Sequence, residues 1–389
     1  MLFVLCGCDA SSIADAGSRD ATADVQSVRD ASAGDTSALD GIPGDAIESD
    51  LATASDVSAQ DTVVPGADVT DASRPLDRFE SLFARRFVPH ATPWPAATDP
   101  SGVSYHCLAA ASGLRRANAG ASFDATFRAQ LDLATRAAAD HLLAIAPTWG
   151  GSGWGLDRAW DAFSDGTTNA ANTVYAFQTG LATWCLAEAA DVTGDTRYRT
   201  LAARAITNYR TRAFVRHGEG YPINCTTCGY FWYSLAAADV GRMVKNTNIE
   251  MAVASLVLDR YGADSAARLS GAQATLAQYG EIFSYANYGY LGRYDTAYVP
   301  MGSSWYDDHN SFEAYLLLRA SELLGRTDFR AAAITHYDAY APRGSAAYVA
   351  YAACHFARVH APAAATCAGW IEANGANNPA GVGLVMDYR

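Results

Sequence analysis

Apolar residues recur along this chain in long runs whose spacing is that of helices rather than strands. Three such runs share one plan, because each is apolar nearly all round and ends in glycine. They occupy residues 178–194, 246–262 and 310–325. A glycine directly after an apolar run suits the left-handed position that closes an α-helix. A second segment with one polar face follows each run, at residues 198–209, 266–279 and 329–340. The pattern therefore predicts three helical hairpins.

The pairing of an all-apolar helix with a one-sided helix predicts two layers. A helix that is apolar all round is buried, whereas a helix with one polar face covers the outside. Two further helical segments, residues 123–145 and 346–360, extend the series, and alternating apolar runs are few. We therefore expect an all-α domain over residues 78–389, with little β-structure. Its expected form is a toroid of about five to six α-helical hairpins.

The N-terminal part of the chain has a different composition. Residues 9–77 hold no aromatic residue and no lysine, and their 15 acidic residues against three arginines give a net charge of −12. Such a segment cannot bury enough apolar surface to offset its ordering entropy, so we expect a disordered acidic linker. Because the whole chain carries −13, the remainder is nearly neutral and has no basic stripe. Nucleic acid is therefore not an expected partner.

The first eight residues, Met-Leu-Phe-Val-Leu-Cys-Gly-Cys, form a short apolar run. They resemble a bacterial lipobox, in which the cysteine after a small residue is lipid-modified, here Cys8. A basic n-region is missing and the run is short, so we expect the true start codon to lie a few codons upstream. Residues 1–8 then predict a lipoprotein signal remnant. The protein would be exported and lipid-anchored at a bacterial membrane, facing the periplasm or cell surface; the alternative is an arbitrary apolar N-terminus.

Six cysteines follow this segment, namely Cys107, Cys185, Cys225, Cys228, Cys354 and Cys367. An even number in an exported protein favours disulfides over free thiols. Cys354 and Cys367 close a short loop and are the first pairing to expect, although spacing leaves the connectivity open. Cys225-Thr-Thr-Cys228 has the spacing of a redox or zinc site, but no second ligand pair with matching spacing lies nearby. We therefore expect no metal and no cofactor.

Each expected inner helix follows a long loop rich in aromatic and polar residues. If all hairpins share one up-and-down sense, these loops lie at the same rim and converge on one cleft. Flat aromatic rings and short polar groups suit a sugar, which has an apolar face and a rim of hydroxyls. The residues expected to bind a polysaccharide or oligosaccharide are Trp154, Trp160, Asp161, Asp165, Asn172, Tyr175, Trp232, Lys245, Asn246, Asn248, Tyr294, Trp305 and Asn310. The alternative is that many of the aromatic residues belong to the core.

Two stretches of the chain are similar to a known protein group. They are residues 154–177 followed by Thr193-Gly-Asp-Thr-Arg-Tyr198, and Trp305-Tyr-Asp-Asp-His-Asn310 before a leucine-rich helix. They resemble carbohydrate-active six-hairpin (α/α) toroids, including the C-terminal domain of D-glucuronyl C5-epimerases. The paired acids are also similar to those of toroidal endo-α-mannanases. The likeness implies a toroid that acts on polysaccharide. In the mannanases apolar and aromatic residues follow the acid pair, whereas this chain has His309 and Asn310, so the hydrolytic mechanism does not carry over directly.

The expected catalytic residues are His309, Asp308, Asp307 and Tyr306. They suit a lyase or epimerase that removes the C5 proton of a uronate, because this reaction needs a base and donors that neutralise the carboxylate. His309 or a nearby tyrosine would take the proton, while asparagines would hold the carboxylate. Those asparagines are Asn246, Asn248 and Asn310.

Two other functions remain open. A glycoside hydrolase would pair Asp307 or Asp308 with a carboxylate from the first loop, Asp161 or Asp165, across the scissile bond. A glycan-binding lipoprotein would use the aromatic residues without catalysis. The acids could also have a purely structural role, because Asn310 and Glu313 have the spacing of a capping box at the start of a helix.

Overall fold

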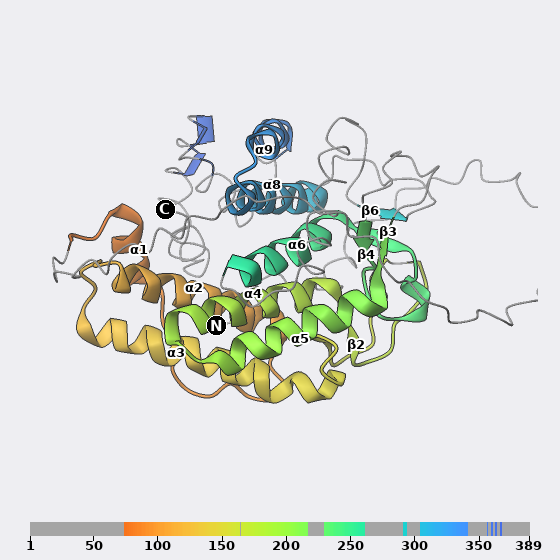
Figure 1. Ribbon diagram of the computed structural model, residues 1–389, viewed down its shortest axis with the longest axis horizontal. Helices are drawn as coiled ribbons and strands as arrows, with labels where there is room; N and C mark the ends of the chain where they lie inside the picture. Colours follow the sequence, from red (N-terminus) through yellow and green to blue (C-terminus); the bar gives the residue numbers. More distant parts are fainter. Residues whose placement is uncertain are drawn as a thin grey trace, which may run out of the picture. The chain divides into compact units, whose positions relative to one another are not determined.

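The described part of the chain is mostly helical (Figure 1). The computed structural model describes residues 74–163, 165–216, 229–260, 291–293, 304–340, 356, 359, 360, 362, 363, 366 and 367. All of them belong to one compact unit, which includes Asp71–Arg389. Within these residues the α-helices are α1 (Arg78–Arg86), α2 (Pro100–Asn118), α3 (Ala125–Ile145), α4 (Ala176–Thr193), α5 (Thr196–Ala213), α6 (Lys245–Arg260), α8 (Ser304–Leu324) and α9 (Thr327–Tyr340). The expected lipobox and residues 9–73 of the expected linker lie outside the described residues. Arg74, within the expected linker, donates to Glu80 and to the carbonyl of Gly120.

Short-range capping fixes several helix ends. Asp99, Asp124 and Asp195 accept backbone N–H groups in the first turns of α2, α3 and α5, which satisfies donors that have no partner inside the helix. Gly194 and Gly325 follow α4 and α8 with positive φ angles of 72° and 65°, as the sequence predicts. Helix α8 begins at Ser304, so the expected capping box at Asn310 and Glu313 is wrong, because both residues lie inside the helix.

Burial divides the helices into an inner and an outer set. Residues 178–190 of α4, 247–258 of α6 and 314–321 of α8 are buried without interruption. Helix α5 buries only one face, at Tyr198, Leu201, Ala202, Ala205, Ile206, Tyr209 and Ala213. Inner helices α2, α4, α6 and α8 contact one another in that order, while α3, α5 and α9 pack against α2, α4 and α8. The sequence pattern predicts this division, although it does not reveal α2.

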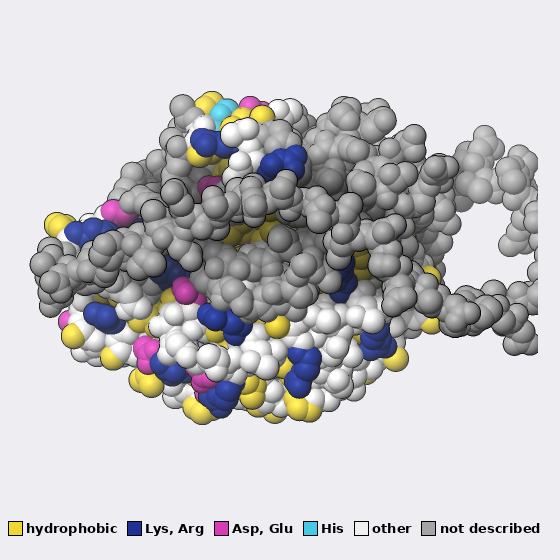
Figure 2. Space-filling view, in the orientation of Figure 1, with side chains coloured by type: hydrophobic (Ala, Val, Ile, Leu, Met, Phe, Trp, Pro, Cys, Tyr) yellow, Lys and Arg dark blue, Asp and Glu magenta, His cyan; other side chains and the backbone are white. Residues whose placement is uncertain are grey.

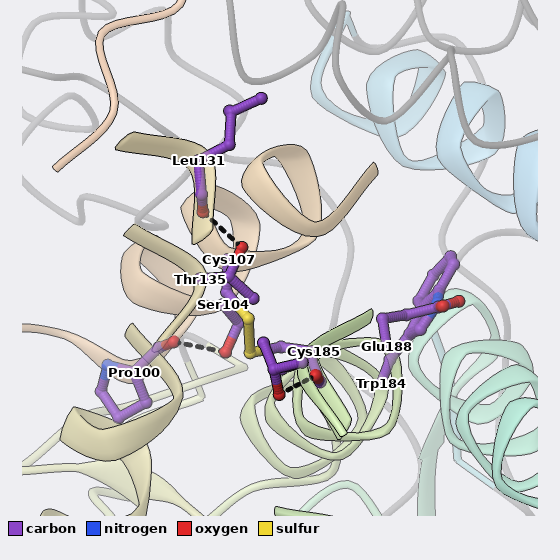
Figure 3. The surroundings of a disulfide bond; sticks show 10 residues. Pro100, Ser104, Cys107, Leu131, Thr135, Trp184, Cys185 and Glu188 are labelled. Atoms are coloured by element: carbon purple, nitrogen blue, oxygen red, sulfur yellow. Dashed lines mark hydrogen bonds between the residues drawn. A yellow bond between two sulfur atoms is a disulfide. The ribbon is translucent and has the colours of Figure 1, made fainter. Parts of the chain in front are cut away.

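Two contacts show that α2 and α4 run in the same direction. Cys107 of α2 forms a disulfide with Cys185 of α4. Farther along both helices, Arg115 of α2 donates to the carboxylate of Glu188 of α4. Because the two contacts occur in the same order along both helices, the helices are parallel. Figure 3 shows the disulfide and Glu188. The expected preference for disulfides is confirmed at this pair, and Cys367 is also disulfide-bonded; Cys225, Cys228 and Cys354 lie outside the described residues.

The outer helices α3 and α5 run opposite to α4. Arg136 in the middle of α3 donates to the carbonyl of Thr193, the last residue of α4, at 3.2 Å. Leu142, farther along α3, accepts from the indole of Trp154, which precedes α4, at 3.0 Å. In α5, Asn208 near the C-terminal end donates to the carbonyl of Gly151 at 3.0 Å. Helices α3 and α5 therefore end near the place where α4 begins, and α3, α4 and α5 lie side by side (Figure 1).

Apart from three isolated bridges, the β-structure of the described residues consists of three short antiparallel pairs. Strand β1 (Gly155–Leu156) pairs with β2 (Thr173–Val174), β3 (Phe214–Arg216) with β4 (Gly229–Phe231), and β5 (Arg242–Val244) with β6 (Leu291–Arg293). Strand β2 leads into α4 and β5 leads directly into α6. The expectation of minor β-structure is confirmed, and the strands fix the loops that precede two inner helices.

Two further features are the charged side chains of the surface and the apolar character of the helices. Arginine and acidic side chains are scattered over the face seen in Figure 2 rather than gathered into one charged patch. None of the helices in the described ranges has both the length and the apolar character that a membrane crossing requires.

Candidate functional site

The loops that precede α4 and α6 meet at one end of the inner helices. The amide of Ala176, at the start of α4, donates to the carbonyl of Tyr233 at 2.9 Å. The amide of Leu235 donates to Val174 at 2.9 Å, and that of Tyr233 donates to Arg242 at 2.8 Å. The expected convergence of the first two loops is therefore confirmed. We call this region the rim.

A third segment reaches the same rim. Strand β6 pairs with β5 so that Arg293 lies opposite Arg242 and Leu291 opposite Val244. The pairing brings the chain that leads toward α8 next to the residues that start α6. Tyr294 follows β6 directly but lies outside the described residues. Of the third expected loop, the structure describes only strand β6, whose backbone pairs with β5 at this rim.

Five aromatic residues gather at the rim, and we call them the aromatic rim cluster. The cluster consists of Trp160, Phe163, Tyr175, Phe177 and Tyr233. The ring centroids of Trp160 and Tyr175 are 5.3 Å apart, and those of Phe163 and Tyr233 are 5.1 Å apart, both in edge-to-face geometry. Tyr175 and Tyr233 are buried, whereas Trp160, Phe163 and Phe177 are partly exposed. The cluster therefore combines a packed base with apolar ring surface that remains accessible to solvent.

The hydroxyl of Tyr175 is placed in an unusual environment. Its side chain is fully buried, and burial raises its pKa to about 12, against the opposing influence of the Asn169 side chain. A phenol with such a pKa stays protonated at neutral pH. Tyr175 is therefore a poor general base, and its burial keeps it from contacting a ligand directly.

A polar network lies beside the aromatic rim cluster, and we call it the ionic rim network. The buried carboxylate of Asp239 accepts from the amide of Asn169 at 2.7 Å and from the hydroxyl of Ser234 at 2.5 Å. Arg242 is 5% exposed and lies 3.7 Å from Asp239. Its guanidinium donates to Asp165 at 2.5 Å. The network therefore joins the first loop to the second through charge-assisted contacts.

Arg242 also links the two clusters. Its guanidinium carbon lies 4.7 Å from the centroid of the Phe163 ring, a distance typical of a cation–π contact. The expected binding set does not include Arg242, Asp239, Asn169 or Phe163. The sequence signal for Asp239 and Arg242 is the short stretch Asp239-Val-Gly-Arg242 before an inner helix, which places opposite charges on either side of a glycine turn.

The acids of the first loop shape the loop itself. The Asp161 carboxylate accepts from the backbone amides of Asp165 at 3.2 Å and Gly166 at 2.9 Å. Asp165 accepts from the amide of Thr167 at 2.9 Å. Side chains that accept from the backbone two to five residues onward stabilise turns. Asn172 is exposed and has a positive φ of 65°, so it also belongs to a turn. These residues lie at the rim, but their contacts are structural.

Three further residues of the expected binding set have core or structural contacts. Trp154 is fully buried and donates its indole N–H to Leu142, so its ring cannot stack on a sugar. Asn248 is fully buried; its Oδ1 accepts from the Phe231 amide at 2.6 Å, and its Nδ2 donates to backbone carbonyls. Trp232 is half-buried and packs against the main core. Packing and backbone pairing already use the side chains of Trp154 and Asn248, which argues against their expected use in binding.

The expected catalytic residues all lie on α8. Trp305, Tyr306, Asp307, Asp308, His309 and Asn310 belong to the first two turns of this helix rather than to a loop before it. Their side chains, and those of Lys245 and Asn246 at the start of α6, lie outside what the structure describes. Their roles stay predictions.

No group of three or more metal-ligating side chains occurs among the described residues. Comparison of the chain with protein-family models and with curated proteins gave no match.

Proposed function

We propose that this protein binds a polysaccharide at the rim and that its helices form an (α/α) toroid of about five to six hairpins. One observation carries the proposal: the loops before two parallel inner helices meet at one end and present the partly exposed rings of Trp160, Phe163 and Phe177 beside charged side chains. Rings with apolar faces next to polar groups are the combination that sugar binding requires.

The reaction that fits best is the removal of the C5 proton of a uronate. In this proposal His309 or Tyr306 moves the proton, Asp307 or Asp308 fixes the histidine tautomer, and Asn246 and Asn310 hold the carboxylate. Support comes from the pairing of β6, the last described segment before α8, with β5 at the rim. The hydrolytic alternative is less favoured, because Asp161 and Asp165 already bind backbone amides and Arg242.

The compartment belongs to the same proposal. The disulfide between Cys107 and Cys185 supports an oxidising environment outside the cytosol. Lipid attachment at Cys8 would hold such a protein at the membrane, and the acidic segment after it would act as a tether.

A second candidate is glycan binding without turnover. It is favoured by the structural use of Asp161, Asp165 and Asn248, which leaves the aromatic rim cluster as the part of the described rim open to a ligand. Both candidates share the binding surface, so one set of measurements separates them.

The test begins with retention on immobilised acidic and neutral polysaccharides. Trp160→Ala should abolish retention, because the substitution removes an accessible ring. Leu133→Ala is the matched control, since Leu133 is an apolar side chain on α3 that is 52% exposed. Equal retention of wild type and Trp160→Ala would overturn the assignment of the binding surface.

Turnover is measured separately. A lyase product absorbs in the ultraviolet, an epimerase incorporates deuterium from heavy water at C5, and a hydrolase releases reducing ends without either signal. His309→Ala should abolish turnover while retention persists. His360→Ala is the control, because it removes a histidine that pairs with Asp338 instead. Retention without any of the three signals in wild type would favour the non-catalytic binder.

A further inference from the structure

The shortest contact of Arg242 in the ionic rim network is with a surface loop. Arg242 and Asp239 are both buried and carry opposite charges. Their atoms are 3.7 Å apart, whereas Asp239 is bound closely by Asn169 and Ser234. The short contact of the guanidinium, at 2.5 Å, is with Asp165, whose side chain is 33% exposed. The nearly buried guanidinium of Arg242 thus has its closest carboxylate, that of Asp165, on a surface loop.

The charge balance does not require Asp165. Arg242 and Asp239 together are neutral, so the buried pair is already compensated. Asp165 adds a third charge that keeps much of its hydration. Another carboxylate could take its place on the guanidinium with no change in the charge of the buried groups. The Asp165 carboxylate is therefore exchangeable on the guanidinium of Arg242.

The surroundings of that contact match a sugar acid. The Phe163 ring lies 4.7 Å from the guanidinium carbon, and it packs against Tyr233, which in turn contacts Phe177. A carboxylate on the guanidinium would therefore have apolar ring faces next to it. An arginine forms two parallel hydrogen bonds to a carboxylate and stacks on an aromatic ring at once, which lysine cannot do.

We propose that Asp165 occupies on Arg242 the place of a ligand carboxylate, so that Arg242 selects acidic glycans and a ligand binds by displacing Asp165. This inference rests on the proposed function, since it specifies the charge of the glycan that the rim binds. Arg242 then determines specificity, and Asp165 is an intramolecular competitor that weakens binding. Neutral glycans contact the rings but do not compete with Asp165.

The test uses calorimetric titration with an oligogalacturonate and a neutral malto-oligosaccharide of equal length. Asp165→Asn should strengthen binding of the acidic oligomer about tenfold, which corresponds to about 1.4 kcal/mol, and leave the neutral oligomer unchanged. Asparagine retains an acceptor for the Thr167 amide. Asp161→Asn is the matched control, because it removes the same charge from the same loop but its carboxylate accepts from Asp165 and Gly166 amides instead.

Arg242→Lys provides the second arm. It keeps the charge but removes the forked donor, so the preference for the acidic oligomer should disappear. Circular dichroism establishes whether this variant folds; if it does not, Asp165→Asn against Asp161→Asn decides alone. Equal gains in those two variants would overturn the inference, because the effect would then be general electrostatics.

The failure of this inference differs from failure of the proposed function. If oligomers bind in a Trp160-dependent manner but Asp165→Asn behaves as Asp161→Asn, only the inference falls. If no variant binds either oligomer, both fall. If Asp165→Asn gains acidic binding that Trp160→Ala leaves unchanged, Arg242 is a carboxylate receptor and the aromatic surface is not part of it.

Discussion

Helix α4 contacts α2 on one side and α6 on the other, and a buried glutamate lies in each interface. Toward α2, Glu188 accepts from the guanidinium of Arg115 and, at 3.1 Å, from the indole of Trp184. The same interface contains the Cys107–Cys185 disulfide (Figure 3). Toward α6, Glu250 lies opposite Gly180, and its Oε1 has no hydrogen-bond partner within the described ranges.

The two interfaces show how burial and hydrogen-bond or ion pairing together determine the protonation state of a glutamate carboxyl. Glu188 lies beside a cation and an N–H donor, which favour the charged form. Glu250 is fully buried, and burial raises its pKa well above the ordinary value, although a backbone contact at Leu181 acts in the opposite sense. The carboxyl of Glu250 is therefore neutral over a wider pH range. One interface is stabilised by a cross-link and an ion pair, whereas the other packs around an acid whose burial favours the neutral form.

The largest expected effect lies on the α2 side. The double variant Cys107→Ser, Cys185→Ser releases a loop with a sequence separation of 78 residues. Chain-entropy reasoning gives a loss of about 4.5 kcal/mol in the free energy of unfolding for a loop of that size. Urea denaturation monitored by circular dichroism measures it. A loss below about 1 kcal/mol would show that the α2–α4 interface does not depend on its cross-link.

Much of the helical framework could be predicted from the sequence, because burial on all sides leaves uninterrupted apolar runs. The runs at 178–194 and 246–262 match α4 and α6 within two residues. Helix α8 starts six residues before Asn310, because its first two turns are polar and carry no apolar period. Helix α2 was missed for a related reason: its alanine, serine and glycine residues are buried without the large apolar side chains that mark a helix.

The site was less predictable. The order of the hairpins predicts that the loops before the inner helices converge, and the loops before α4 and α6 do meet at the rim. However, the partners of Arg242 depend on the path of the first loop, because Asp165 is 77 residues away in sequence. Asn248 was expected to bind a ligand, but an asparagine near a helix start also pairs with the backbone, here at Phe231 and Val244. Sequence patterns do not distinguish these two uses.

A substitution at Gly180 tests the packing on the α6 side. A Cβ atom there would lie 2.8 Å from Oε1 and 3.2 Å from Cγ of Glu250. Gly180→Ala should therefore lower the free energy of unfolding by about 2 to 3 kcal/mol through overpacking. Thermal and urea denaturation measure the change.

The matched control is Gly102→Ala in α2, where an added Cβ meets nothing within 4 Å. It should stabilise the protein by up to about 1 kcal/mol, because alanine favours the helix more than glycine does. Combining Gly180→Ala with Glu250→Ala should recover part of the loss, since the second substitution removes the clashing atoms. Equal effects of the two glycine substitutions would show that Glu250 does not occupy the space beside Gly180.

Glu188→Gln should have a smaller effect on the α2 side. The substitution removes the charge that faces Arg115, but Arg115 retains Asp191 at 3.2 Å, and a glutamine oxygen can still accept from Trp184. We expect a loss of about 1 to 2 kcal/mol in the free energy of unfolding. Asp132→Asn, which breaks the half-exposed pair with Arg136, is the control and should cost less. A neutral outcome for Glu188→Gln would mean that the ion pair adds nothing to the disulfide.

At acid pH, the smallest change in the free energy of unfolding is expected for Glu250→Gln. The pH dependence of this variant distinguishes the two glutamates. The folded-state pKa of Glu250 lies above its ordinary value of 4.5. Below pH 4.5 the wild-type protein has the full stabilising contribution of the Glu250 carboxyl. It loses this contribution as the pH rises through the folded-state pKa, by at most about 1.4 kcal/mol per pH unit.

Glutamine does not titrate. The variant should match wild type near pH 5 and become the more stable protein as the pH rises, whereas Glu188→Gln should stay less stable at neutral and alkaline pH. Urea denaturation at pH values from about 5 to 9 measures both curves; if wild type and Glu250→Gln change in parallel, Glu250 is charged in the folded protein and the two interfaces treat their acids alike.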